Sequence, residues 1–222
     1  MKFKVVFNLD GAGVYYDPSE PIHLDALLSW TLAPRQRVHQ HLSRDDDPKT
    51  VFLPLMRHKA ESGWFWKASA LLPEGDQGED LQHWRKRFRQ SRADLCSGNP
   101  NLQNGTYREW NMPMPLILTR RMVAYADGNR KAVKKLLREV RYLGKKRAHG
   151  LGRIVSMDFE EMEEDFSLVM EGQAMRWLPD DNGSRLVRLR PPYWNRTDRV
   201  LCCEVGDEIR GFLDSGGKAA FV

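Results

Sequence analysis

The sequence predicts an α+β fold in which two helices cover one face of a β-sheet, with an inserted lobe and an irregular C-terminal extension. Short apolar runs typical of strands alternate with two amphipathic helical patterns. A polar and basic segment interrupts these patterns, and the end of the chain has no regular period. A chain of 222 residues, 41% of them hydrophobic, is long enough for one large domain with such an insertion.

The first strand and the first helix are predicted from short-range patterns. Residues 2–9 form an apolar, β-rich run that ends at the turn residues Asp10 and Gly11. Residues 22–33 carry leucines at helical spacing, and Pro34 ends that pattern. We therefore expect a buried strand followed by a helix that packs on the sheet.

The next part of the chain predicts two strands and then an insertion. Residues 51–55 and 64–72 are strand-like and are separated by a turn at Gly63. In residues 73–111, Gly, Asp, Asn and Gln become common, which indicates a lobe that projects from the core. Within this lobe, residues 84–92 are expected to form a basic helical patch.

The remaining elements complete a second strand–helix–strand pattern. Residues 116–125 predict a strand, and Asn129 is placed to cap the helix that follows. That helix is expected to run to Gly144, with a basic face opposite an apolar stripe. Residues 153–159 predict the next strand, and residues 185–190 a short one. The apolar stripe comprises Val133, Leu136, Leu137, Val140 and Leu143.

The predicted order is strand, helix, strand, strand, helix, strand, which is the ferredoxin-like βαββαβ order. In this interpretation the core is discontinuous and comprises residues 1–72 and 112–165. Residues 73–111 form the basic insertion, and residues 166–222 form a C-terminal extension packed on the core.

Charge is distributed unevenly along the chain, whose formal net charge is +5. Residues 130–153 hold ten Lys or Arg residues and one acid, whereas residues 158–171 hold seven acids and no base. This segregation predicts that one face binds the phosphates of a polyanion. The acidic run is interpreted as a solvated edge or a contact with another subunit.

Cysteine usage and hydropathy exclude several classes of protein. The chain has three cysteines, Cys96, Cys202 and Cys203, which argues against a disulfide framework. They form no CxxC motif, which argues against a structural zinc site. No apolar run is long enough to span a membrane, and the N-terminal run is too interrupted for a signal peptide. We therefore expect a cytoplasmic protein without membrane contact.

The strongest motif is Gly-Lys-Lys-Arg-Ala-His-Gly-Leu-Gly-Arg at residues 144–153. Its glycines allow positive φ angles and close approach of a ligand to the backbone, and its cations can bind phosphate. It lacks the GK[ST] of a P-loop and follows a helix rather than opening one. A C-capping turn with lysines that complement the helix dipole is the alternative. The candidate phosphate-binding residues are Gly144, Lys145, Lys146, Arg147, His149, Gly150, Gly152 and Arg153.

A second cluster, residues 83–92, holds five Lys or Arg residues and two aromatic residues without an acid. Aromatic rings can stack on bases while cations bind phosphates. The alternative is a solvated helix with Trp84 and Phe88, which are four residues apart, on its buried face. The candidate nucleic-acid-binding residues of this cluster are Arg85, Lys86, Arg87, Arg89 and Arg92.

Histidines suggest two further hypotheses. His149, inside the basic loop, could act as a general base on a 2′-hydroxyl or as a hydrogen-bond donor to RNA. His39 and His41 would share one face of a strand, but no acidic or cysteine set completes a metal site, so a polar loop is favoured. We therefore predict no metal, no cofactor and no catalytic residue, with His149 the candidate if the protein is a ribonuclease.

Three segments resemble the RAMP superfamily of CRISPR proteins, whose ferredoxin-like (RRM-like) domains carry a glycine-rich loop after the second helix. They are Pro-Ile-His-Leu-Asp-Ala-Leu-Leu at residues 21–28, the loop at residues 144–152, and Arg-Pro-Pro-Tyr-Trp at residues 190–194. The likeness spans residues 3–203 and is greatest to the type IV subunit that caps the 5′ handle of the guide RNA. Taken alone, residues 188–196, which include the last segment, favour a core-closing loop over a stacking platform.

The resemblance implies a non-catalytic subunit that binds the crRNA 5′ handle and nucleates assembly of a type IV complex for RNA-guided DNA targeting. The insertion would fold over the RNA as a thumb. The implied partners are the guide RNA, the CRISPR backbone and large subunits, target DNA near the protospacer-adjacent motif, and indirectly a helicase. Two alternatives stay open: a metal-independent endoribonuclease that processes precursor guide RNA, and an adaptor that contacts proteins through residues 158–171.

Overall fold

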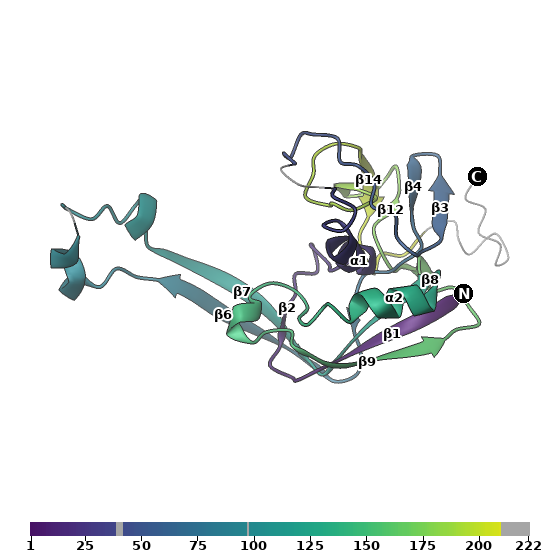
Figure 1. Cartoon of the computed structure of the whole chain (residues 1–222), viewed down its shortest axis with the longest axis horizontal. Coiled ribbons are helices and arrows are strands. Elements are labelled where there is room, and N and C mark those ends of the chain that lie inside the picture. The colour runs from purple at the N-terminus through teal and green to yellow at the C-terminus, as the bar shows by residue number, and fades with distance from the viewer. Residues whose placement is uncertain (39–41, 97, 210–222) are drawn as a thin grey trace.

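The computed structural model describes residues 1–38, 42–96 and 98–209 and is a mixed α+β structure made mostly of strands (Figure 1). The described residues include two α-helices, α1 (Leu24–Leu32) and α2 (Arg130–Leu137). None of the helices in these ranges is long and apolar enough to cross a membrane.

A four-stranded antiparallel sheet forms the centre of the structure. Its strand order is β5-β8-β1-β9, so strands that are distant in sequence are neighbours. The four strands are β1 (Lys2–Leu9), β5 (Leu72–Pro73), β8 (Arg121–Asp127) and β9 (Ile154–Glu161). The predicted strand at residues 2–9 is therefore confirmed, with the long apolar run at the middle of the sheet.

Both helices pack on the same face of this sheet. Phe3, Val5 and Phe7 alternate along β1, are almost fully buried, and belong to one cluster with residues of α1 and α2. At the start of α2 the Asn129 side chain accepts a hydrogen bond from the Ala132 N–H at 3.1 Å, which confirms the predicted cap. The buried helix residues in this cluster include Leu24, Leu28, Val133, Leu136 and Leu137.

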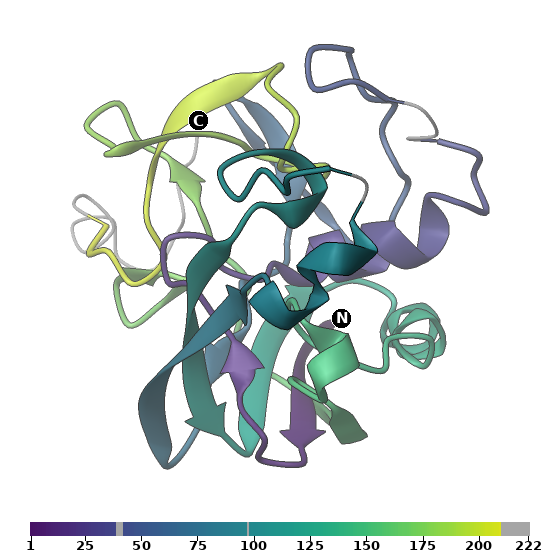
Figure 2. The ribbon, with the colours of Figure 1, turned by 90° about the vertical axis from the view of Figure 1, so that its left-hand side faces the viewer.

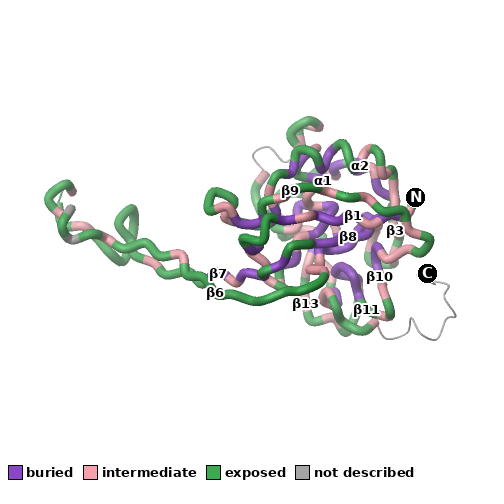
Figure 3. Tube along the Cα trace, turned by 90° about the horizontal axis from the view of Figure 1, so that it is seen from below, coloured by how far each residue is buried: buried purple, intermediate pink, exposed green. Residues whose placement is uncertain are grey.

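A long two-stranded hairpin extends away from the rest of the molecule (Figures 1 and 3). It consists of β6 (Gln77–Lys86) and β7 (Trp110–Thr119), and β2 (Val14–Tyr15) pairs with the base of β7. The tip carries two 3₁₀ turns, η1 (Gln90–Leu95) and η2 (Gly105–Tyr107). Most of the hairpin is exposed, as Figure 3 shows in green and pink.

The C-terminal part is built from short strands rather than irregular chain. These strands pack over a second hydrophobic core, separate from the core between the central sheet and the helices. It includes Trp177 and Cys202 of the C-terminal part and Phe65 of β4. A small third cluster, with Val6 and Met175, covers the other face of the central sheet. The remaining strands are β3 (Arg57–Ala60), β4 (Gly63–Trp66), β10 (Val169–Met170), β11 (Gln173–Ala174), β12 (Leu178–Pro179), β13 (Arg185–Arg188) and β14 (Arg199–Cys203).

Several predicted boundaries are wrong for physical reasons. The predicted strand at residues 116–125 is two strands, β7 and β8, which belong to different sheets and meet at Arg120. Residues 51–55 form no strand, although Val51, Leu53 and Leu55 are buried in the main core. The second helix ends at Leu137 rather than at Gly144.

The helical patch predicted at residues 84–92 is also wrong. Residues 84–86 belong to β6, and η1 begins only at Gln90. Trp84 lies opposite Met112 on β7, so its partner is supplied by the neighbouring strand and not by a residue four positions away. The four-residue spacing of Trp84 and Phe88 therefore does not indicate a helix.

Candidate nucleic-acid interface

Residues 144–152, which we call the glycine loop, form a tight and exposed turn. Gly144, Gly150 and Gly152 have φ angles of 71°, 82° and 67°, so all three occupy the left-handed region that favours glycine. Lys146 also has a positive φ, 64°, and precedes the single 3₁₀ turn η3 (Arg147–His149). The loop is thus shaped by backbone conformations that most side chains avoid.

The ends of the glycine loop are held against the core while its tip is free. A Cβ at Gly152 would lie 2.1 Å from the carbonyl oxygen of Leu143, and one at Gly144 would lie 2.6 Å from that of Tyr15. The Gly152 N–H also donates to the Gly13 carbonyl at 2.8 Å. By contrast, nothing lies within 4 Å of the Cβ position at Gly150.

This difference gives a prediction about two alanine substitutions. Gly150→Ala should destabilise the protein by about 1–2 kcal/mol, because only the left-handed φ is unfavourable there. Gly152→Ala should cost about 2 kcal/mol more, since its Cβ also overlaps a buried backbone carbonyl. Urea unfolding of both variants measures the difference. Equal midpoints would show that the close packing at Gly152 has no energetic role.

The cations of the glycine loop are mostly free to meet a ligand. Lys145 lies over the Tyr15 ring at 5.1 Å and makes a long contact to Glu20 at 3.5 Å, with both charged side chains more than half exposed. Arg147 and Arg153 are exposed and have no ion-pair partner within residues 1–38, 42–96 and 98–209. The loop therefore presents unneutralised charge.

The glycine loop meets the long hairpin through aromatic contacts. The Lys146 ammonium lies over the ring of Trp84 on β6, at 2.6 Å from its centroid. Trp84 also stands edge-on to Trp110 at 4.3 Å and to His149 at 6.1 Å between centroids. The two regions singled out in the sequence are therefore adjacent in space (Figures 1 and 2). The contact lies near the outer end of β6, where Trp84 is two residues before Lys86.

Strand pairing divides the basic residues of the hairpin between two faces. Trp84 lies opposite Met112, and Lys86 lies opposite Trp110, so these four residues share the face that meets the glycine loop. Arg85 is on the other face, where its Nε donates to Asn111 Oδ1 at 3.0 Å. The cluster at residues 83–92 is therefore not one continuous patch.

The hairpin tip is organised by its own contacts. The rings of Phe88 and Tyr107 are 5.6 Å apart and edge-on, and the Phe88 N–H donates to a Glu109 carboxylate oxygen at 2.8 Å. Arg87 and Arg89 are exposed and have no ion-pair partner in the part of the chain that the structure describes. Arg92 lies in η1.

A buried polar cluster joins two segments that the sequence singled out separately. The fully buried guanidinium of Arg176 contacts Asp25 at 3.4 Å, Tyr193 Oη at 2.9 Å and several backbone carbonyls. Tyr193 Oη in turn donates to Asp25, at 2.8 Å from its nearer carboxylate oxygen. Residues 21–28 and 190–194 are therefore bound to each other, which supports the interpretation of residues 190–194 as a core-closing loop.

Burial dominates the acid–base properties of this cluster. Desolvation raises the pKa of Asp25, although Arg176 and the Tyr193 hydroxyl oppose that shift. Desolvation also lowers the pKa of His23 well below its usual value, and the charge of Arg176 adds to that effect. His23 packs between Trp177 and Tyr193, and neither of its ring nitrogens has a hydrogen-bond partner among the residues that the structure describes.

Arg176 is the residue that sequence reasoning missed. It lies in the run Ala174-Met175-Arg176-Trp177-Leu178, where a single cation stands among apolar residues. A lone charge in an apolar run is a signal of a buried, paired group, since an unpaired one would be too costly to bury. The run is too short to show a helical or strand periodicity, so no pattern of that kind drew attention to Arg176.

Within the described ranges, no group of three or more His, Cys, Asp or Glu side chains is placed to hold a metal ion. His39 and His41 lie outside the described residues. Cys202 and Cys203 are buried, and burial raises the pKa of the Cys202 thiol to about 12.

Comparison with protein-family models gives a match over most of the chain. The family model described as "CRISPR type IV associated protein Csf3" matches residues 2–99 and 98–205. The two matched segments together cover nearly all of the described chain. No curated protein matches the chain.

Proposed function

Because this chain belongs to the Csf3 family of CRISPR type IV associated proteins, we propose that it is the subunit that binds the 5′ handle of the guide RNA. In this proposal the protein has no catalytic role. It nucleates assembly with the backbone and large subunits for RNA-guided DNA targeting. Target sequence is read by base pairing between guide and target, as in other RNA-guided complexes, and a helicase acts downstream.

The arrangement of the central sheet supports assignment to the RAMP superfamily. With α1 between β1 and β5, and α2 between β8 and β9, the order β5-β8-β1-β9 is compatible with a split βαβ, ferredoxin-like arrangement. We accordingly propose residues 1–72 and 112–165 as the core, 73–111 as the thumb and 166–222 as the extension. The β6–β7 pairing reaches Thr119, so the thumb hairpin is rooted eight residues beyond position 111.

The observation that carries the proposal is the junction between Lys146 and Trp84. It brings the exposed cations of the glycine loop beside the aromatic face of the hairpin. Phosphates can then contact backbone N–H groups and cations of the loop while an unpaired base stacks on the neighbouring rings. Lys86 lies on the same face as Trp84, whereas Arg85 would bind from the opposite side.

The residues proposed to bind RNA are divided among three places. The first is the glycine loop with Arg153, the second is the outer part of the hairpin strands, with Lys86 on the face of Trp84 and Arg85 on the opposite face, and the third is the hairpin tip. The complete set is Gly144, Lys145, Lys146, Arg147, His149, Gly150, Gly152, Arg153, Arg85, Lys86, Arg87, Arg89 and Arg92.

His149 is proposed to bind RNA and not to cleave it. Its ring stands edge-on to Trp84, with 6.1 Å between the ring centroids, an arrangement suited to packing beside a base. A metal-independent ribonuclease would need an additional group poised to donate or accept the second proton.

The proposal is tested by leaving this subunit out of a reconstituted type IV complex. With the subunit present, the 5′ handle should resist nuclease digestion, and without it the handle should be degraded while the rest of the guide stays protected. Precursor guide RNA incubated with the subunit alone in EDTA should stay intact. Equal protection with and without the subunit would contradict the proposal, and specific cleavage in EDTA would replace it with the ribonuclease alternative.

A further inference from the structure

The strand β9 forms one edge of the central sheet. It pairs with β1 on one side, and no strand within residues 1–38, 42–96 and 98–209 pairs with its other side. Only its start is covered there, because the Ile154 N–H donates to the Arg141 carbonyl at 3.0 Å and Tyr142 bridges to Arg153. Residues 155–161, roughly 20 Å of extended chain, are therefore an open edge, which Figure 1 shows at the lower margin of the molecule.

Hydrogen bonds at the two ends of β1 show which of its residues bond to which neighbour. The Leu9 N–H donates to the Arg120 carbonyl at 2.8 Å, so the odd-numbered residues of β1 bond toward β8. The Met162 N–H donates to the Lys2 carbonyl at 3.0 Å, so the even-numbered residues bond toward β9. The backbone groups of β1 thus alternate between its two partners.

This alternation identifies the free backbone groups of the open edge. The register places Lys4 opposite Glu160, so the even-numbered residues of β9 are the ones that bond to β1. The N–H and C=O groups of Met157, Phe159 and Glu161 therefore point outward, and they have no backbone partner among the described residues. These groups are the template that an added strand requires.

The side chains of the open edge differ between the two faces of the sheet. Met157 and Phe159 are partly buried against the main core, and the Lys134 ammonium of α2 lies over the Phe159 ring at 5.4 Å. Asp158 and Glu160 are exposed on the opposite face. An added strand would therefore place apolar side chains beside Met157 and Phe159, and basic ones beside the two acids.

The carboxylates along β9 are weakly neutralised. Glu160 is 3.9 Å from Lys4, and Glu161 is 3.7 Å from Arg130. Both carboxylates are more than half exposed, so these ion pairs contribute little to stability. Both acids can exchange these partners for another cation at little cost.

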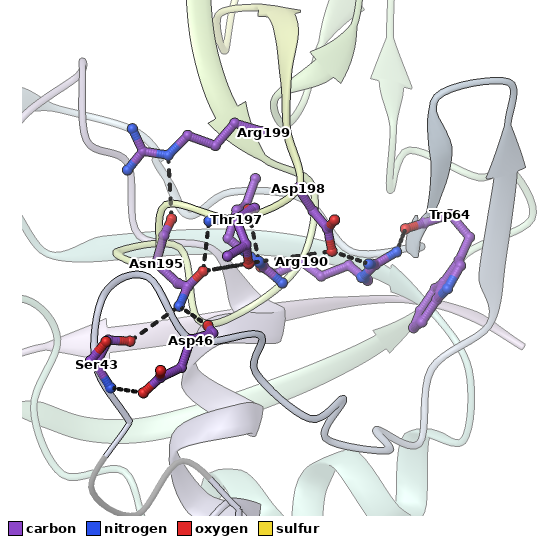
Figure 4. A network of polar contacts seen from close by, with 9 residues as sticks. Ser43, Asp46, Trp64, Arg190, Asn195, Thr197, Asp198 and Arg199 are labelled. Atoms are coloured by element: carbon purple, nitrogen blue, oxygen red, sulfur yellow. Dashed lines mark hydrogen bonds and ion pairs between the residues drawn. The ribbon is translucent and has the colours of Figure 1, made fainter.

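Negative charge continues beyond the end of the strand. Glu163 and Glu164 are exposed and have no ion-pair partner in the part of the chain that the structure describes. Figure 4 shows the contrasting case of Asp198, which is 3.3 Å from an Arg190 guanidinium that also donates to the Trp64 carbonyl. The charge beside the open edge is therefore available to a partner.

This charge decides what kind of chain the open edge accepts. Two copies of this protein paired through β9 would bring acidic side chains together, which destabilises a strand pair. A polynucleotide is repelled by the same acids. A basic protein segment is attracted, and in strand addition the main-chain hydrogen bonds supply the affinity.

We propose that the open edge binds an extended segment of another protein subunit of the type IV complex, in which apolar residues alternate with lysine or arginine. The segment adds a strand to the central sheet beside β9. The inference rests on the proposed assembly with other subunits, but it does not require that the glycine loop binds the handle.

Residue-resolved amide hydrogen exchange, with the chain alone and in an assembled type IV complex, tests this inference. In the free chain the amides of Met157, Phe159 and Glu161 should exchange roughly tenfold or more faster than those of Asp158 and Glu160. In the complex the three outward amides should become as slow as their neighbours. Outward amides that stay fast in the complex would overturn the inference.

Two further outcomes of the exchange experiment would also contradict a protein segment. Protection by guide RNA alone would assign the open edge to RNA. Protection that grows with the concentration of the isolated chain would assign it to a second copy. Handle protection and β9 protection are read separately, so loss of the first alone contradicts handle binding, and loss of the second alone contradicts strand addition.

A proline substitution tests the main-chain hydrogen bonds. Met157→Pro and Met157→Ala both remove the side chain, but only proline removes the outward N–H, which does not bond to β1. Incorporation of the proline variant into the complex should be roughly tenfold weaker than that of the alanine variant. Equal incorporation would contradict strand addition, and the exchange measurement decides the question if the proline variant does not fold.

A charge reversal tests the choice of a basic segment. Glu160→Lys should weaken incorporation by roughly tenfold, because it places like charges opposite each other. Asp181→Lys makes the same change of charge at an exposed acid between β12 and β13, and it should have little effect. If the two variants behave alike, the partner segment is not selected by the acids of β9.

Discussion

Replacing Arg176 with methionine should destabilise this protein by about 3–5 kcal/mol. The substitution leaves the Asp25 carboxylate buried without its cation, and it removes the donor that holds several backbone carbonyls. For a chain of this length, the loss corresponds to a fall in Tm of roughly 10 °C or more. Thermal unfolding followed by circular dichroism measures it.

Two further variants test whether the stranded buried charge causes the destabilisation by Arg176→Met. Arg196→Met removes an arginine that is 56% exposed and 3.9 Å from an exposed aspartate, so its effect should stay within about 0.5 kcal/mol. Adding Asp25→Asn to Arg176→Met should recover part of the lost stability, because the stranded charge is gone. A Tm of Arg176→Met equal to that of the unmodified chain would show that the cluster does not hold α1 to the C-terminal strands.

Replacing Lys145, Lys146 and Arg147 together with alanine should have the largest effect on RNA binding. Each cation that contacts a single-stranded phosphate contributes about 0.7 to the slope of log K against log salt concentration, so the slope should fall by about 2. At moderate salt the affinity for the 5′ handle should fall roughly tenfold to a hundredfold. Fluorescence anisotropy over a salt series gives both quantities.

The control removes the same charge elsewhere on the surface. Arg44, Arg120 and Arg196 are exposed and lie outside the glycine loop and the hairpin, and their triple alanine variant should lower the slope only slightly. If both triple variants reduce the slope equally, binding depends on overall charge, and the glycine loop has no special part in it.

The elements that the sequence predicted well are those fixed by local pattern. The run at residues 2–9 needs no distant partner to be recognised as a strand, and Asn129 caps the next helix through a contact three residues away. The glycine loop was also recognisable, because its glycines and cations are contiguous. Local chemistry was therefore sufficient for the loop and for the start of the second helix.

The parts that were missed depend on contacts between distant residues. Trp84 pairs with Met112 across the hairpin, and nothing within residues 84–92 reveals that partner. The second helix ends at Leu137 because the following backbone turns to meet the glycine loop, with the Leu143 N–H donating to the Gly152 carbonyl at 2.8 Å. Val140 and Leu143 are nevertheless buried, so the apolar stripe continues without the helix.

Contacts between distant residues also explain why each motif segment, taken alone, was a weak indicator of function. Residues 21–28 and 190–194 have no feature that points to a common site, yet Asp25 and Tyr193 are hydrogen-bonded and share Arg176. The two segments therefore make a structural connection between α1 and the C-terminal part of the chain. The proposed RNA-binding surface therefore depends on the glycine loop and the hairpin.

Ultraviolet crosslinking of the guide RNA in an assembled type IV complex tests that surface most directly. Photoreactive nucleotides in the 5′ handle should crosslink to Trp84 and to residues 145–149, and nucleotides in the spacer should not. Handle crosslinks that map to another subunit, or to a part of this chain remote from the loop and the hairpin, would contradict the account.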